Sequence, residues 1–447
     1  MDTFYVSCFV VLLIICVLAQ YVTYSTSELR KSRVFLNFQY NFLSVYLISM
    51  AADWLQGPYV YALYEFYGFS EKEIGQLFIA GFGSSMIFGT VVGSFADKYG
   101  RKKNCILFGI IYALSCITKH FNNYNILMVG RLLGGIATSL LFSAFESWMV
   151  FEHNKHQYPG DLLSNTFSLS TFGNGIIAIL AGLIANTVAG KWGFVAPFDT
   201  SLVLLIVEII IVSLTWTENY GDQKIELQAS FSNAWKSMIA DPKIWLLGSI
   251  QSLFEGAMYI FVFKWTPSLA SKIPGETIPH GFIFACFMVS VMIGSGLFKF
   301  LIARHKVENF SRFMFAVATF SLAVPIFTES RPIRLFGFFL FEVCCGIFWP
   351  CLGTMRGKYV PEEVRATIMN FFRVPLNLIV VLILLKTGDI STQTVFTCCT
   401  ALLLAATLCQ QRLYNLTKAL ADQHLQTALL SKEDLEETDE APRFGGH

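Results

Sequence analysis

Long apolar stretches alternate with short polar ones along nearly the whole chain. A helix needs about 20 apolar residues to cross the hydrocarbon core of a bilayer. Thirteen stretches come close to that length: 3–23, 36–64, 74–96, 104–119, 124–150, 164–189, 196–216, 244–266, 279–303, 312–328, 333–355, 366–386 and 391–412. The pattern therefore predicts an all-α, polytopic membrane protein.

The polar segment 217–243 divides the twelve later stretches into two sets of six. We therefore predict five parts: an extra N-terminal transmembrane helix with its link at 1–35, a first six-helix bundle at 36–216, a linker at 217–243, a second six-helix bundle at 244–412 and a tail at 413–447. The linker carries Phe231, Trp235 and Met238 as an amphipathic patch, which predicts a helix on the inner membrane surface. The tail is acidic, and we expect it to be disordered.

Charged residues beside the apolar stretches predict the orientation of the chain. Asp2 precedes the first stretch, whereas Arg30, Lys31 and Arg33 follow it, which favours a retained helix over a cleaved signal. Alternating sides from there places seventeen Lys and Arg residues in inner loops and eight in outer loops. We expect a multi-pass protein of the plasma membrane with its N-terminus outside and its C-terminus in the cytoplasm.

Composition excludes several classes of protein. Hydrophobic residues make up 54% of the chain and charged residues 14%, against about 25% charged in soluble domains. The net charge of +1 gives no reason to expect a nucleic-acid partner. The 11 cysteines lie almost entirely in apolar stretches and have no metal-ligand spacing. We also find no nucleophile–base arrangement and no phosphate-binding glycine loop, so we expect no metal, no cofactor and no enzyme.

A basic turn, Gly93–Lys103, separates two of the apolar stretches and reads Gly-Ser-Phe-Ala-Asp-Lys-Tyr-Gly-Arg-Lys-Lys. Any tight cytoplasmic turn can be basic and contain glycines, but this order is more specific. It resembles the signature that major facilitator superfamily transporters carry between their second and third core helices. The residues that carry the resemblance are Gly93, Asp97, Gly100, Arg101 and Lys102. The resemblance implies two six-helix halves with a substrate site between them, near the middle of the membrane.

Polar residues inside the apolar stretches are the strongest candidates for function, because a charge at mid-bilayer costs a few kcal/mol or more unless it is paired or faces a cavity. On the first core helix, Tyr46, Asp53 and Gln56 share one face. On the fourth, Arg131 resembles the superfamily's fourth-helix arginine, and Glu146 follows nearer the cytoplasm. Asp53 and Glu146 could instead be structural carboxylates that bond to a neighbouring helix or to the basic turn.

The second half carries three more polar positions or stripes. Gln251, Glu255 and Tyr259 recur every four residues on the seventh core helix, which indicates a face toward a cavity. Glu342 lies on the tenth core helix. A further stripe on the eleventh core helix consists of Asn370, Arg373 and Asn377.

These residues indicate an anion carrier. The planar guanidinium of arginine suits oxyanions, and a carboxylate near mid-depth can carry a coupling proton. We assign substrate binding to Arg131, Arg373, Gln56, Asn370, Gln251 and Tyr259, and coupling or gating to Asp53, Glu255, Glu342 and Glu146. The alternative is that the arginines only neutralise these carboxylates and touch no substrate.

Several stretches also resemble one family within the superfamily, the molybdate-anion transporters. They are Ala-Ala-Asp53-Trp54-Leu-Gln56-Gly-Pro58-Tyr, Leu-Phe-Ser-Ala-Phe-Glu146-Ser-Trp148, Leu-Phe-Glu255, Phe-Glu342-Val-Cys-Cys-Gly and Asn370-Phe-Phe-Arg373-Val-Pro375. Lys264 departs from this pattern, because an apolar residue is expected there. The resemblance implies uptake of the small anion molybdate. Two alternatives remain open: a carrier of sugars or other organic solutes, and a transporter-like sensor or scaffold without flux.

Overall fold

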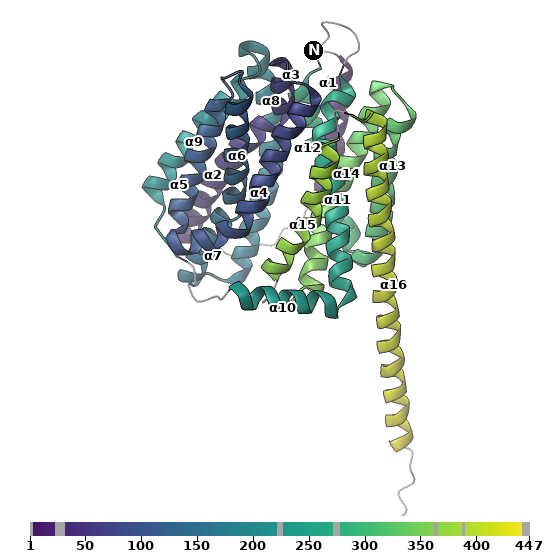
Figure 1. Ribbon diagram of the computed structural model, residues 1–447. Coiled ribbons are helices and arrows are strands. Elements are labelled where there is room, and N and C mark those ends of the chain that lie inside the picture. Colours follow the sequence, from purple (N-terminus) through teal and green to yellow (C-terminus); the bar gives the residue numbers. More distant parts are fainter. Residues whose placement is uncertain are drawn as a thin grey trace, which may run out of the picture.

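The computed structural model is built from helices (Figure 1). It describes residues 3–22, 32–220, 227–270, 278–361, 365–386 and 389–439. Within these ranges, the side chains at 90–98, 160–161, 164, 227–231, 233, 365–367, 370 and 420–439 lie outside the description. The described part contains no strand, and ten of its helices are long and apolar enough to cross a membrane. The prediction of an all-α membrane protein is therefore confirmed.

The helices follow the apolar stretches closely. The first part of the chain forms α1 (Thr3–Val22), α2 (Arg33–Gln56), η1 (Gly57–Tyr59), α3 (Val60–Phe66), α4 (Glu71–Tyr99), α5 (Arg101–Thr118), α6 (Tyr124–Leu141), α7 (Ala144–Lys155), α8 (Gly160–Trp192) and α9 (Ala196–Thr215). The second part forms α10 (Leu227–Ala240), α11 (Pro242–Leu269), α12 (His280–Ile302), α13 (Val307–Phe327), α14 (Arg331–Tyr359), α15 (Arg365–Leu384) and α16 (Thr392–Asp439). Two spans are interrupted: α2, η1 and α3 follow one another directly at Gly57–Pro58, and α6 gives way to α7 at Phe142–Ser143.

The spans form two bundles that stand side by side (Figure 1). The helices α2, α3 and α5 to α9 share one core, and α11 to α16 share another. The described buried apolar residues of α4 belong to a third cluster, which also contains Phe263 of α11 and Leu376 of α15. Because the spans alternate in direction, one end of the bundles carries the turn at Gly100, and we call it the Gly100 end. The other carries the turns at Gly68 and Gly193, and we call it the Gly68 end.

The extra helix α1 packs on the second bundle, although it precedes the first in sequence. Its residues Tyr5, Cys8 and Cys16 are buried. Near its end, Gln20 donates from Nε2 to the carbonyl oxygen of Met292 on α12, at 3.1 Å. The helix thus adds an outer layer to α12 and leaves the face of α2 free for α8 and α9.

The linker helix α10 crosses the Gly100 end of the molecule (Figure 1). Trp235 is half exposed, and its ring lies 6.0 Å from that of Phe371 on α15. Met238 packs against the core of the second bundle, whereas the side chain of Phe231 lies outside the described residues. The expectation of a helix in the linker agrees with this arrangement.

The expectation of a disordered tail was wrong for most of its length. The last helix, α16, continues through Asp439 and projects beyond the bundle (Figure 1). The segment from 413 to 439 contains no glycine or proline and is rich in Leu, Ala, Gln and Glu. These residues favour helix, so acidity alone did not predict disorder. Residues 440–447 lie outside the description.

Candidate functional site

The packing of α11 on α15 positions the central polar residues. Ser252 on α11 donates from its hydroxyl to the carbonyl oxygen of Phe372, at 2.7 Å. One turn earlier, the ring of Phe372 lies so close to Gly248 that a Cβ there would meet it at 2.2 Å. This contact holds the two helices in register, so that Glu255 on α11 and Arg373 on α15 lie at similar depth.

Arg373 reaches from the second bundle toward the first. Its side chain is exposed, yet its Nη1 lies 3.2 Å from the position of a Cβ on Gly89 of α4. No acceptor for its guanidinium is found among the described residues. Arg373 is therefore a cation between the bundles that is available to an anion.

Glu255 is buried on α11, at 5% exposure. Arg356 and Arg373 act on it through their charges, and Gln251 acts on it through a side-chain hydrogen bond. Its Oε1 and that of Gln251 have no hydrogen-bond partner in the described part of the chain. Buried polar atoms are usually bonded, so these two acceptors mark a place for a proton, a water or a ligand.

Aromatic rings close the space between the bundles from Tyr259 toward the Gly68 end. The ring centroid of Tyr259 lies 4.9 Å from that of Phe82 on α4. One turn further, Phe263 makes edge contacts with Tyr61, at 5.4 Å, and with Phe78, at 5.2 Å. Next to this layer, Lys264 on α11 forms an ion pair with Glu71 at the start of α4.

Arg131 is held inside the first bundle. Its Nε donates to the carbonyl oxygen of Leu77 on α4, at 3.2 Å. Its guanidinium lies 4.9 Å from the ring centroid of Phe78, and a Cβ on Gly81 would overlap it. The structure thus places Arg131 against α4 and toward the Gly68 end, away from Arg373.

Asp53 and Gln56 also face the interior of the first bundle. Asp53 accepts a 2.6 Å hydrogen bond from the hydroxyl of Tyr112 on α5. Gln56 donates from Nε2 to Ser201 on α9, at 3.0 Å, and Ser201 donates to the carbonyl oxygen of Ala52. These bonds join α2 to α5 and α9 within one half of the molecule.

The remaining predicted site residues are dispersed. Glu342 is buried on α14 next to Cys345. Glu146 is exposed at the Gly100 end, where it lines a cleft of about 520 Å³ together with Arg101 and Ser147. Asn370 belongs to α15, but its side chain lies outside the described residues. The structure therefore brings together Glu255, Gln251, Tyr259 and Arg373, and places Arg131, Gln56, Asp53, Glu342 and Glu146 elsewhere.

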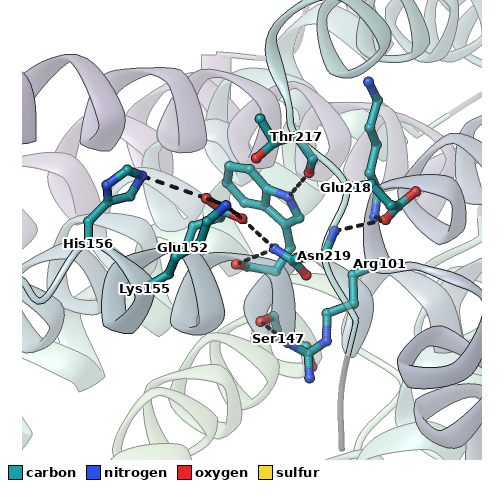
Figure 2. Close-up of polar contacts among 10 residues, drawn as sticks. Arg101, Ser147, Glu152, Lys155, His156, Thr217, Glu218 and Asn219 are labelled. Atoms are coloured by element: carbon teal, nitrogen blue, oxygen red, sulfur yellow. Dashed lines mark hydrogen bonds and ion pairs between the residues drawn. The ribbon is translucent and has the colours of Figure 1, made fainter.

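The basic turn is closed by a carboxylate that follows α9 (Figure 2). Glu218 accepts from the backbone N–H of Lys102, at 2.9 Å, and of Lys103, at 3.3 Å. Both groups belong to the first turn of α5, where unpaired N–H groups favour an anion. Gly100 has a φ of +109°, and a Cβ there would lie 2.5 Å from Cδ of Glu218. A glycine is thus required at this position for two reasons: the positive φ of the backbone and the closeness of the Glu218 carboxylate.

Further contacts fasten the same segment to α7 (Figure 2). Arg101 donates from Nη1 to the carbonyl oxygen of Ser147, at 3.2 Å. Asn219 donates from Nδ2 to Glu152, at 3.0 Å, while its carbonyl oxygen accepts from the N–H of Arg101. The first residues after α9 therefore lock α5 to α7. Gly93 lies within α4, but its surroundings and the side chain of Asp97 lie outside the described residues.

Gly100→Ala is expected to destabilise the folded protein by about 1–3 kcal/mol, because it forces a side chain into a left-handed backbone and against Glu218. Thermal unfolding of the purified protein measures this effect. Gly190→Ala is the matched control, since nothing lies within 4 Å of its Cβ position. Equal melting temperatures for the two variants would contradict the role assigned to Gly100.

Sequence reasoning missed two features of this region. Glu218 directly follows an apolar stretch, but its role depends on a turn more than 100 residues earlier in the chain. Arg356 lay just beyond the predicted stretch 333–355, and only the structure places it near Glu255. Lys264 departs from the apolar residue expected at its position, and this departure is the signal in the sequence for its ion pair with Glu71.

Comparisons with known proteins agree with this architecture. A family model described as sugar transporters with 12 transmembrane segments matches residues 4–338. The molybdate-anion transporter of Xenopus tropicalis is 36% identical over 415 residues, covering 88% of this chain and 89% of that protein. The molybdate-anion transporter of Danio rerio is 34% identical over 448 residues, covering 89% of this chain and 92% of that protein. These relatives are transporters, so the chain is a transporter and not an enzyme.

Solved structures have the same fold. The nucleoside transporter NupG superimposes with a TM-score of 0.68 at 12% identity, covering 85% of this chain and 99% of that chain. The D-xylose-proton symporter superimposes with a TM-score of 0.65 at 12% identity, covering 85% of this chain and 97% of that chain. At such identities the similarity concerns the fold alone. From the family match, the relatives and the fold, the chain is a multi-pass membrane transporter that belongs to the major facilitator superfamily, in the family that includes the molybdate-anion transporters.

Proposed function

We propose that this protein is a secondary active transporter that takes up a small oxyanion, with molybdate as its substrate. Two six-helix halves, 36–216 and 244–412, alternate access to a site between them. The observation that supports this most directly is Arg373, an exposed guanidinium between the bundles for which the described residues supply no acceptor. The names of the relatives point to molybdate.

The chemistry of the central residues fits this substrate class. A guanidinium donates two parallel hydrogen bonds to an oxyanion, which gives both strength and orientation. Further polar groups come from Gln251 and Tyr259 on α11 and from Asn370 on α15, the helix that carries Arg373. Arg131 on α6 and Gln56 on α2 complete the proposed binding set from the first half, in a conformation where these helices approach the substrate.

We also propose that transport is coupled to protons through buried carboxyl groups. Glu255 has an unpartnered oxygen at the level of Arg373, so a proton there and an anion on the arginine would influence each other. We also assign coupling or gating to Asp53, Glu342 and Glu146, because each is a carboxyl group within an apolar stretch and can carry a proton. The proposed location is the plasma membrane, with the Gly100 end in the cytoplasm because the basic turn and most loop cations lie there.

One observation favours a second candidate, a carrier of sugars or related solutes. The matching family model is described as sugar transporters, and an aromatic layer of Tyr61, Phe78, Phe82, Tyr259 and Phe263 lies beside the central residues. Aromatic rings stack on sugars, whereas a neutral sugar would not neutralise the charge of Arg373. The two candidates therefore differ in the charge of the preferred solute.

Uptake into proteoliposomes that contain the purified protein separates these candidates. With an inward proton gradient, we expect saturable molybdate uptake that tungstate competes with and that neutral sugars do not. Collapse of the gradient with a protonophore should lower the uptake if protons are coupled. Competition by sugars without competition by oxyanions would favour the second candidate. Absence of flux for every solute would instead support a sensor or scaffold.

A further inference from the structure

Arg356 lies in the last turn of α14 and was not among the residues that the sequence suggested. Its side chain crosses from α14 to α15, where Nη1 approaches the sulfur of Met369 at 3.7 Å. Its Nε donates to the carbonyl oxygen of Leu352 on its own helix, at 3.3 Å. Met369 is one helical turn before Arg373, so the two guanidinium groups are anchored at neighbouring places on α15.

The charges of the described residues at this place do not balance. Arg356 and Arg373 act electrostatically on each other and on one carboxylate, Glu255. Among the described residues, neither arginine has a carboxylate oxygen within 4.0 Å. In the described part of the chain, two cations thus share one anion that is not in direct contact with either. In a membrane interior, such an excess of positive charge is unfavourable unless a further anion enters.

A structural role explains Arg356 less well. A structural cation near a helix end would extend to the membrane surface or pair with a carboxylate. Lys358, two residues later on the same helix, does this: its Nζ lies 2.6 Å from a carboxylate oxygen of Glu308. Arg356 instead turns inward, is half-buried, and has a thioether as one of its acceptors, which is a weak one.

We propose that Arg356 is a second oxyanion-binding residue, which together with Arg373 forms a two-arginine site for a tetrahedral dianion between α14 and α15. The inference rests on the proposed function and adds the charge of the substrate to it. When Glu255 carries the proposed coupling proton, the two guanidinium groups balance a dianion such as molybdate, tungstate or sulfate. A monoanion would leave one guanidinium uncompensated and a neutral sugar would leave both, so the site selects for dianions.

Kinetics in proteoliposomes test this inference. Arg356→Ala is expected to raise the KM for molybdate by about 10- to 100-fold, the loss typical of a hydrogen bond to a charged group. Arg356→Lys should recover part of the affinity, because it restores the charge but not the planar fork. Lys358→Ala is the matched control and should leave the KM unchanged. If Arg356→Ala lowers the yield, Arg356→Gln keeps most of the side-chain length and serves the same purpose.

A competition panel gives a second measurement that a structural role would not change. The ratio of inhibition by the dianion sulfate to inhibition by the monoanion nitrate should fall in Arg356→Gln. The inference is overturned if the Arg356 variants keep both the wild-type KM and the wild-type inhibition ratio while Arg373→Ala abolishes transport. The proposed function would stand in that case. If wild-type protein transports no oxyanion, the proposed function fails and the inference fails with it.

Discussion

Arg373→Ala is expected to reduce oxyanion transport by at least about 100-fold while the protein still folds and reaches the membrane. The reason is that Arg373 presents two donors to the substrate, and each hydrogen bond to a charged group contributes about 1.5–3 kcal/mol. Loss of stability should be small, since the side chain is exposed and has no described acceptor. Molybdate uptake per amount of reconstituted protein measures the effect.

Two variants make this result interpretable. Arg373→Lys keeps the charge and should retain part of the activity, because an ammonium group cannot make the paired contacts of a guanidinium. Val374→Ala changes the neighbouring residue, whose side chain is 57% exposed, and should leave uptake unchanged. Normal molybdate uptake by Arg373→Ala would remove this residue from the site and would leave the central cation without a function.

Glu71→Gln is expected to open the Gly68 end of the transporter. The ion pair of Glu71 with Lys264 joins α4 of one half to α11 of the other. Lys264 is 1% exposed and Glu71 33% exposed, and among the described residues Glu71 is the carboxylate that pairs with the cation. Removal of one partner of a buried pair costs about 3–5 kcal/mol, because the remaining charge stays buried and unpaired. The closed state bears this cost, whereas an open state would hydrate the lysine.

A change of that size in the free-energy difference would make the open state of the Gly68 end more populated than the closed state. Introduced cysteines detect it: Phe284→Cys, which faces Gly57 across the closed end, should react faster with a membrane-impermeant maleimide in the Glu71→Gln background. The charge-swapped pair Glu71→Lys with Lys264→Glu should restore slow labelling. Glu73→Gln, at an exposed position two residues away, is the control. Identical labelling rates in all of these proteins would show that the ion pair does not hold the end closed.

The positions of the helices could be predicted from the sequence because membrane thickness determines their length. The stretch predicted at 196–216 is a helix over Ala196–Thr215, and that at 279–303 is a helix over His280–Ile302. Where the membrane does not set the boundary, the prediction failed. The helix α16 continues through Asp439, since local helix propensity decided its end and acidity did not.

Candidate site residues could be predicted only as far as charge in an apolar stretch reveals them. Arg373 and Glu255 were found in this way, and the charge of Arg373 acts on Glu255 in the structure. The same criterion selected Gln56, whose hydrogen bonds lie within the first bundle. It could not select Arg356, which follows its apolar stretch and so looks like an ordinary loop cation in the sequence.

The sequence by itself determined that the chain is a helical membrane protein, where its spans lie and which ionisable residues they contain, because these properties depend on local hydrophobicity and length. Only the tertiary structure decided which of those residues meet. The ion pair of Lys264 with Glu71 joins residues 193 positions apart, and arginines from two other helices act electrostatically on Glu255. Such pairings depend on how the two bundles and their helices pack, and no local pattern in the chain records that packing.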